Sequence, residues 1–90
     1  MDYEWDEEKA ARNVEKHGIF FADAATVFDD PLYVDFYDPD HSSNEQRYPV
    51  IGMSREGHLV IVSYTERTDV IRLISAREVT LAERKAYEEG

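Results

Sequence analysis

The chain has 90 residues, of which 20 are acidic and 10 basic, and its formal net charge is −10. Apolar residues make up 42% of it, which is ordinary for a folded domain and too high for a disordered chain. The absence of cysteine excludes disulfides, a thiol nucleophile and zinc–thiolate sites, and the overall acidity disfavours non-specific nucleic-acid binding, in which attraction to phosphate dominates.

The N-terminal third predicts a short strand followed by two helices. Asp6 is a good N-cap for a helix over residues 7–17, and Gly18 can adopt the left-handed conformation that ends it. Apolar positions at helical spacing predict a second, short helix over residues 21–29, which Pro31 ends.

The first helix carries its cations on one stripe. Lys9, Arg12 and Lys16 fall at positions i, i+3 and i+7, so their side chains point the same way. In a chain with twice as many acids as bases, such a stripe is a candidate for binding an anion. The opposite stripe is expected to face the core and holds Ala10, Val14 and His17.

Apolar runs predict four further strands, over residues 32–37, 47–54, 59–66 and 70–77. Short turns separate the last three, so we expect an antiparallel meander, and residues 38–45 read as a long polar loop. Thr80 and Glu83 predict a capping box that opens a C-terminal helix to about Tyr87. The expected fold is α+β, a small antiparallel sheet of about four to five strands with two N-terminal helices and one C-terminal helix covering one face.

The composition and this element order indicate a single domain over residues 1–90. The N-terminus lacks the basic and apolar regions of a signal peptide, and the chain has no apolar run long enough to span a membrane. We therefore expect a cytoplasmic location.

Short segments spread over most of the chain form a specific combination. They are Glu4-Trp5-Asp6, Lys9, Asn13, Lys16-His17-Gly18, residues 24–31, Arg47, Ile51-Gly52, Thr65-Glu66-Arg67, residues 71–77 and Glu83-Arg84 with Tyr87-Glu88. Together they resemble the BrnT family of type II toxins. The resemblance implies a RelE-like fold and a metal-independent ribonuclease that needs no cofactor and blocks translation. It also implies a BrnA-like ribbon-helix-helix antitoxin as partner, through which alone the pair would contact operator DNA.

Metal-free RNA cleavage requires a base for the ribose 2′-OH, cations for the phosphorane-like charge and a proton donor for the 5′ oxygen. The catalytic candidates are Arg67 and Arg77 for the charge, Glu66 or His17 as the base, and Tyr87 as an accessory group. The candidates for binding the RNA substrate are Lys9, Lys16, Arg47 and Arg72.

The relative positions of the three arginines depend on the turn that follows Arg67. If residues 68–69 form a two-residue hairpin loop, Arg67 and Arg72 share one face of the sheet, and Arg77 lies on the other with Glu66. A one-residue slip or a bulge would exchange these sets. The sequence therefore leaves open whether the arginines form one site.

Several candidates also have a purely structural interpretation. His17 can act as a C-terminal helix cap, Arg72 as an apolar stem with a paired head, and Tyr87 as a packing residue. An oxygen-rich loop lacks the spacing of an EF-hand, so we assign no metal to its residues Asp38, Asp40, His41 and Glu45.

Two further functions stay open beside the ribonuclease. The acidic surface suits an inactive binding module that only pairs with a basic antitoxin. An orphan scaffold or regulatory domain is the third hypothesis.

Overall fold

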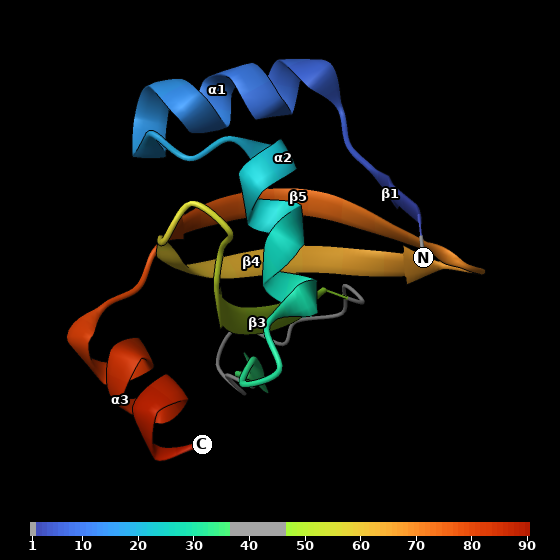
Figure 1. Cartoon of the computed structure of the whole chain (residues 1–90). Coiled ribbons are helices and arrows are strands. Elements are labelled where there is room, and N and C mark those ends of the chain that lie inside the picture. Colours follow the sequence, from blue (N-terminus) through green and yellow to red (C-terminus); the bar gives the residue numbers. More distant parts are fainter. Residues whose placement is uncertain (1, 37–46) are drawn as a thin grey trace.

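The computed structural model describes residues 2–36 and 47–90 (Figure 1), so the predicted polar loop over residues 38–45 lies outside the described residues. The elements in chain order are β1 (Asp2–Glu4), α1 (Glu7–His17), α2 (Phe21–Ala24), the 3-10 helix η1 (Ala25–Asp29), β2 (Val34–Asp35), β3 (Tyr48–Met53), β4 (Leu59–Arg67), β5 (Val70–Glu78) and α3 (Leu81–Glu89). This order confirms the α+β class. Within the described ranges, no helix has the length and apolar character needed to cross a bilayer.

The strands form one sheet in the order β1-β5-β4-β3-β2. The predicted antiparallel meander is β3-β4-β5, with β4 at the centre of the sheet. β1 pairs with β5 in parallel, which the sequence did not predict. The N-terminal strand β1 thus lies at the edge of the β4–β5 hairpin.

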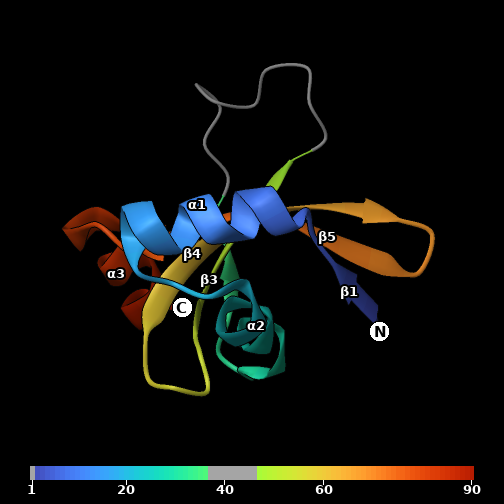
Figure 2. The same cartoon turned by 90° about the horizontal axis from the view of Figure 1, so that it is seen from above.

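Helices cover both faces of the sheet (Figure 2), so the expectation that they cover one face was wrong. We call the face under α1, α2 and η1 the inner face, which includes Val50, Val60, Val62, Tyr64, Ile71, Leu73 and Ala76. The outer face is the other one, and α3 covers only its part around Ile51, Leu59 and Ile61. Ala86 and Tyr87 on the apolar side of α3 pack against these three residues, and this contact fixes the position of α3.

Local capping fixes α1 as predicted. The Asp6 side chain accepts hydrogen bonds from the backbone N–H groups of Glu8 (2.8 Å) and Lys9 (3.1 Å). Gly18 ends the helix with a φ of 72°, a conformation that costs glycine little. These hydrogen bonds also hold the pKa of Asp6 below its ordinary value.

The second helix covers the predicted residues 21–29, but its latter half is η1, a 3-10 helix. It lies directly on β3, where a Cβ at Gly52 would come within 2.9 Å of the Val27 Cβ. Among the described residues, the strand predicted over residues 32–37 is reduced to β2, and Leu32, which precedes it, is 67% exposed.

One buried polar side chain joins α1 to the sheet. The Asn13 amide donates to the carbonyls of Ala76 (2.8 Å) and Ile19 (2.9 Å), and its oxygen accepts from the Ala76 N–H (3.1 Å). Because β1 pairs only with the first residues of β5, Asn13 takes the place of a neighbouring strand farther along that edge. The predicted core stripe of Ala10 and Val14 is only partly buried, whereas Asn13 is 6% exposed.

The substitution Asn13→Ala should lower the free energy of unfolding by about 3 kcal/mol, because it leaves buried backbone groups without partners. Urea denaturation of both proteins measures this difference. The control Arg12→Ala, on the exposed side of the same helix, should change it by less than about 0.5 kcal/mol. Equal losses in the two variants would contradict the role given to Asn13.

Candidate nucleic-acid interface

One extra residue in β5 decides where the arginines point. The strands β4 and β5 pair from Arg67↔Val70 to Tyr64↔Leu73, but the next pair is Ser63↔Ser75, so Ile74 has no partner. Paired residues of antiparallel strands share a face, and a bulge reverses the alternation beyond it. Arg77 therefore lies on the outer face.

Arg67 and Arg72 also lie on the outer face, because Arg67 pairs with Val70 and residues 68–69 form a two-residue loop. Of the arrangements that the sequence left open, the structure shows the loop together with a bulge, and the bulge puts Arg77 on the same face as the other two arginines. We call the part of the outer face that α3 leaves uncovered the arginine face, with Ser63, Thr65, Arg67, Arg72, Ser75 and Arg77.

The three arginines form a row rather than a cluster. Arg72 is paired with Thr65, two residues from Arg67, and Arg77 is paired with Ile61, six residues from Arg67. At ~3.3 Å per residue these separations are roughly 7 Å and 20 Å. Arg67 and Arg77 are thus too far apart to hold one phosphate together, whereas Arg67 and Arg72 are neighbours.

Arg77 is held by a carboxylate of α3. Its guanidinium donates two parallel hydrogen bonds to Glu83, at 2.8 and 2.9 Å, and Glu83 is 7% exposed. This contact lowers the pKa of Glu83 and raises that of Arg77. Glu83 also closes the predicted capping box with Thr80, so one carboxylate positions both the helix and the arginine.

Arg72 is held by β1. Glu4 is its direct neighbour in the parallel pair, and their side chains meet at 2.7 Å while remaining partly exposed. Arg67 is exposed at the end of β4, and the described residues place no carboxylate within ion-pair distance of it. Within residues 2–36 and 47–90, the row therefore contains two cations held by carboxylates and one, Arg67, with no carboxylate partner.

Two lysines of α1 extend this row beyond the edge of the sheet. Asn13 points at the edge of β5, and at ~100° per residue Lys9 and Lys16 lie about 40° and 60° to one side of it. Ala10 lies on the other side, toward the inner core. Lys9 and Lys16 consequently border the arginine face.

The electrostatics of the helix start agree with this arrangement. The cap hydrogen bonds are the main cause of the lowered pKa of Asp6, and the positive charges of Lys9 and Arg72 add to it. Both cations therefore lie near that carboxylate, one from α1 and the other from β5.

Two of the remaining candidates, Glu66 and His17, lie apart from the row. Glu66 is paired with Ile71 and points to the inner-face side, opposite the arginines. His17 ends α1, one turn beyond Asn13, and is partly buried. Arg47 is exposed and directly precedes β3.

Tyr87 lies on α3 and donates a hydrogen bond of 2.7 Å to the Asp30 carboxylate. This contact raises the pKa of Tyr87 to about 12, so the hydroxyl stays protonated at neutral pH. Asp30 also accepts from the N–H groups of Leu32 and Met53. These contacts favour the structural interpretation of Tyr87.

Two residues that matter here were not predicted in these roles, namely Glu4 and Glu83 as partners of the arginines. The capping box identified Glu83 as a helix residue, but its contact with Arg77 depends on the bulge. Glu4 is brought to Arg72 only by the parallel pairing of β1. Neither contact has a local signal in the sequence.

A second polar cluster lies at the turn between β3 and β4. Ligand atoms of Asp23, Glu56 and His58 lie within 4.8 Å of one another, a set that could hold a divalent cation. Burial would raise the pKa of Asp23, but hydrogen bonds from Ser54, the Glu56 N–H and the His58 ring lower it overall. These hydrogen bonds fix the turn against α2.

The family model described as the ribonuclease toxin BrnT of type II toxin–antitoxin systems matches residues 5–83. The chain belongs to the BrnT family. A comparison with curated proteins finds no match. Membership of a type II toxin–antitoxin family implies an antitoxin partner.

The fold of this BrnT chain is similar to a solved structure, the crystal structure of the Brucella abortus ribonuclease toxin BrnT. The TM-score is 0.68 and the identity 24%, with 89% of this chain and 97% of the other covered. At this identity the match establishes the fold. It confirms the five-stranded α+β architecture expected for a BrnT toxin.

The substitution Glu83→Gln should lower the free energy of unfolding of this BrnT chain by about 1–2 kcal/mol at neutral pH. Because the folded-state pKa of Glu83 lies below its ordinary 4.5, the wild-type advantage should be complete above that pH. It should disappear as the pH falls through the lowered pKa. Urea unfolding across this range tests the prediction, with Glu89→Gln on the same helix as a control that should match the wild type throughout.

Proposed function

We propose that this BrnT chain is a metal-independent endoribonuclease that cleaves RNA and inhibits translation in the cytoplasm. We further propose that its partner is a ribbon-helix-helix antitoxin of the BrnA type, which alone contacts operator DNA. Family membership supports the toxin class. The single observation that supports the site is the row of Arg67, Arg72 and Arg77 on one exposed sheet face, with Lys9 and Lys16 at its border.

The reaction is a transfer within the RNA. The 2′-oxygen loses its proton and attacks the adjacent phosphorus, and the 5′ oxygen leaves with a proton, giving a 2′,3′-cyclic phosphate and a 5′-hydroxyl. Arg67 and Arg72, roughly 7 Å apart, are suited to stabilise the charge on the reacting phosphate. Arg77, Lys9 and Lys16 would bind neighbouring phosphates and fix the register of the strand.

The base requires a group on the same side as the arginines. Glu66 points away from them, so its assignment needs an RNA strand that passes around the end of the hairpin. Glu4 is the carboxylate beside Arg72. His17 follows Asn13 by four residues, so at ~100° per residue it lies on the Ala10 side of α1, toward the inner core. Glu4 is therefore the candidate base that the geometry favours for testing, and His17 is kept as the alternative that the sequence suggests.

The alternative function, an inactive module that only pairs with its antitoxin, has one observation in its favour. Two of the three arginines already hold carboxylates, and the chain has a net charge of −10. RNA would have to compete with Glu4 and Glu83 for these guanidinium groups. Activity measurements separate the two functions.

Purified protein in EDTA should cleave an end-labelled RNA and leave 2′,3′-cyclic phosphate ends. Arg67→Ala and Arg72→Ala should each slow cleavage by about 100-fold, because each removes a cation from the reacting phosphate. Gel analysis of single-turnover cleavage measures these rates.

The matched control is Arg55→Ala, which removes an equal charge from an exposed arginine in the turn between β3 and β4. It should cleave at the wild-type rate. Equal slowing in all three variants would assign the effect to net charge, and cleavage by none of the proteins would favour the inactive binding module.

The substitution Tyr87→Phe should leave RNA cleavage unchanged and lower the free energy of unfolding by about 1 kcal/mol, because it removes only the hydrogen bond to Asp30. Cleavage rates and urea unfolding of the same preparation give both values. A large loss of cleavage at wild-type stability would instead give Tyr87 a direct role on the RNA.

A further inference from the structure

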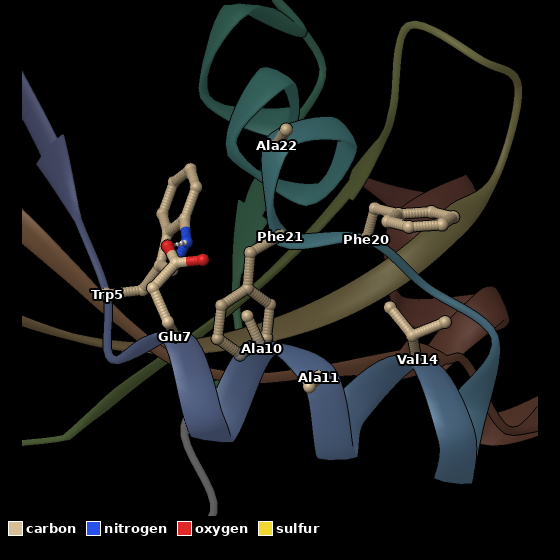
Figure 3. A pocket seen from close by; sticks show the side chains of 8 residues that line it. All are labelled: Trp5, Glu7, Ala10, Ala11, Val14, Phe20, Phe21 and Ala22. Atoms are coloured by element: carbon tan, nitrogen blue, oxygen red, sulfur yellow. Dashed lines mark hydrogen bonds between the residues drawn. The ribbon is translucent and has the colours of Figure 1, made fainter.

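An apolar groove lies between α1 and α2, on the side of the molecule away from the arginine face. Trp5 and Phe20 stand at its two ends, and Phe21 and several small side chains lie between them (Figure 3). Phe20 is 61% exposed although it is a large aromatic residue. The other residues that line the groove are Glu7, Ala10, Ala11, Val14, Phe21 and Ala22.

A second groove continues from the first, and Trp5 and Ala22 line both. It runs past Tyr3, Ala25 and Thr26 along α2 and η1. Together the two grooves form an apolar surface on α1, α2 and η1, the helices that cover the inner face. We call it the helix groove.

The charges that line the helix groove all have one sign. Three of its lining residues are acidic and none is basic, the acidic ones being Glu7, Asp2 and Asp29. The Glu7 carboxylate already accepts a hydrogen bond from the Trp5 indole N–H, at 3.0 Å (Figure 3). These carboxylates would repel an RNA backbone. A cationic segment with apolar side chains could instead pair its charges with the carboxylates and bury its apolar side chains in the groove.

We propose that the helix groove is the docking site of a basic amphipathic helix from a protein partner. Its apolar side chains contact Phe20 and the alanines, and its lysines or arginines pair with Glu7, Asp2 and Asp29. The identification of this partner as the antitoxin rests on the proposed function. Because the groove and the arginine face lie on opposite sides of the sheet, the partner's helix is held without contacting the arginines.

Trp5 provides the measurement, because it is the only tryptophan of the chain and lines both grooves. The probe is a synthetic peptide of about 15 residues, long enough for a helix, with leucines on one face and lysines on the other. A second peptide carries glutamate in place of every lysine. Titration into the full chain should change the Trp5 fluorescence saturably with the lysine peptide and not with the glutamate peptide.

Two variants block the groove from different elements. Ala22→Arg on α2 and Ala11→Arg on α1 each put a large cation on an exposed lining position. Each should weaken lysine-peptide binding at least tenfold, a loss of about 1.4 kcal/mol. The matched control, Ala82→Arg on α3, adds the same charge at an exposed position outside the groove and should bind like the wild type. Urea unfolding verifies that all three variants are folded.

Each other outcome would overturn the proposal. Equal weakening in all three variants would show only attraction to an acidic protein, and absence of saturable binding would show that the groove takes no such helix. A wild-type dimer that Ala22→Arg dissociates in sedimentation would assign the groove to a second copy of the chain. RNA cleavage is measured in a separate experiment. A protein that does not cleave RNA can still bind the lysine peptide, and a protein that does not bind the peptide can still cleave RNA.

Discussion

The arginine face depends on the bulge at Ile74. The buried positions of β5 are Ile71, Leu73 and Ala76, so the apolar pattern itself shifts by one residue. Without the bulge, Ser75 and Arg77 would occupy the inner face, where burying a guanidinium is costly. The same feature keeps the core apolar and places Arg77 in line with Arg67 and Arg72. Packing of the inner face thus determines the charge pattern of the outer one.

Asn13 provides the second constraint, because it joins α1 to the open edge of β5. Its amide satisfies backbone groups that no strand covers, and this fixes the rotation of the helix. Lys9 and Lys16 are thereby directed to the side of the arginines, and the alanines of α1 to the helix groove. A chain with a net charge of −10 can in this way separate a cationic surface from an acidic, apolar one.

Features set by neighbouring residues were predictable from the sequence. The Asp6 cap, the end of α1 at Gly18 and the Thr80 capping box all depend on local chemistry. Features set by distant residues were not. The parallel pairing of β1 brings Glu4 to Arg72, and the packing of α3 on the outer face brings Glu83 to Arg77. The bulge had a weak signal, the break in alternation between Leu73 and Ala76, but the hairpin register alone did not reveal it.

The proposed ribonuclease function requires RNA to bind the arginine face. The most direct test is an NMR titration of the isotope-labelled protein with a short 2′-O-methyl RNA, which lacks the free 2′-hydroxyl and cannot be cleaved. We expect the largest shifts at the guanidinium and backbone signals of Arg67, Arg72 and Arg77, with smaller ones at Lys9 and Lys16. Shifts confined to the helix groove, or none at RNA concentrations that support cleavage, would contradict it.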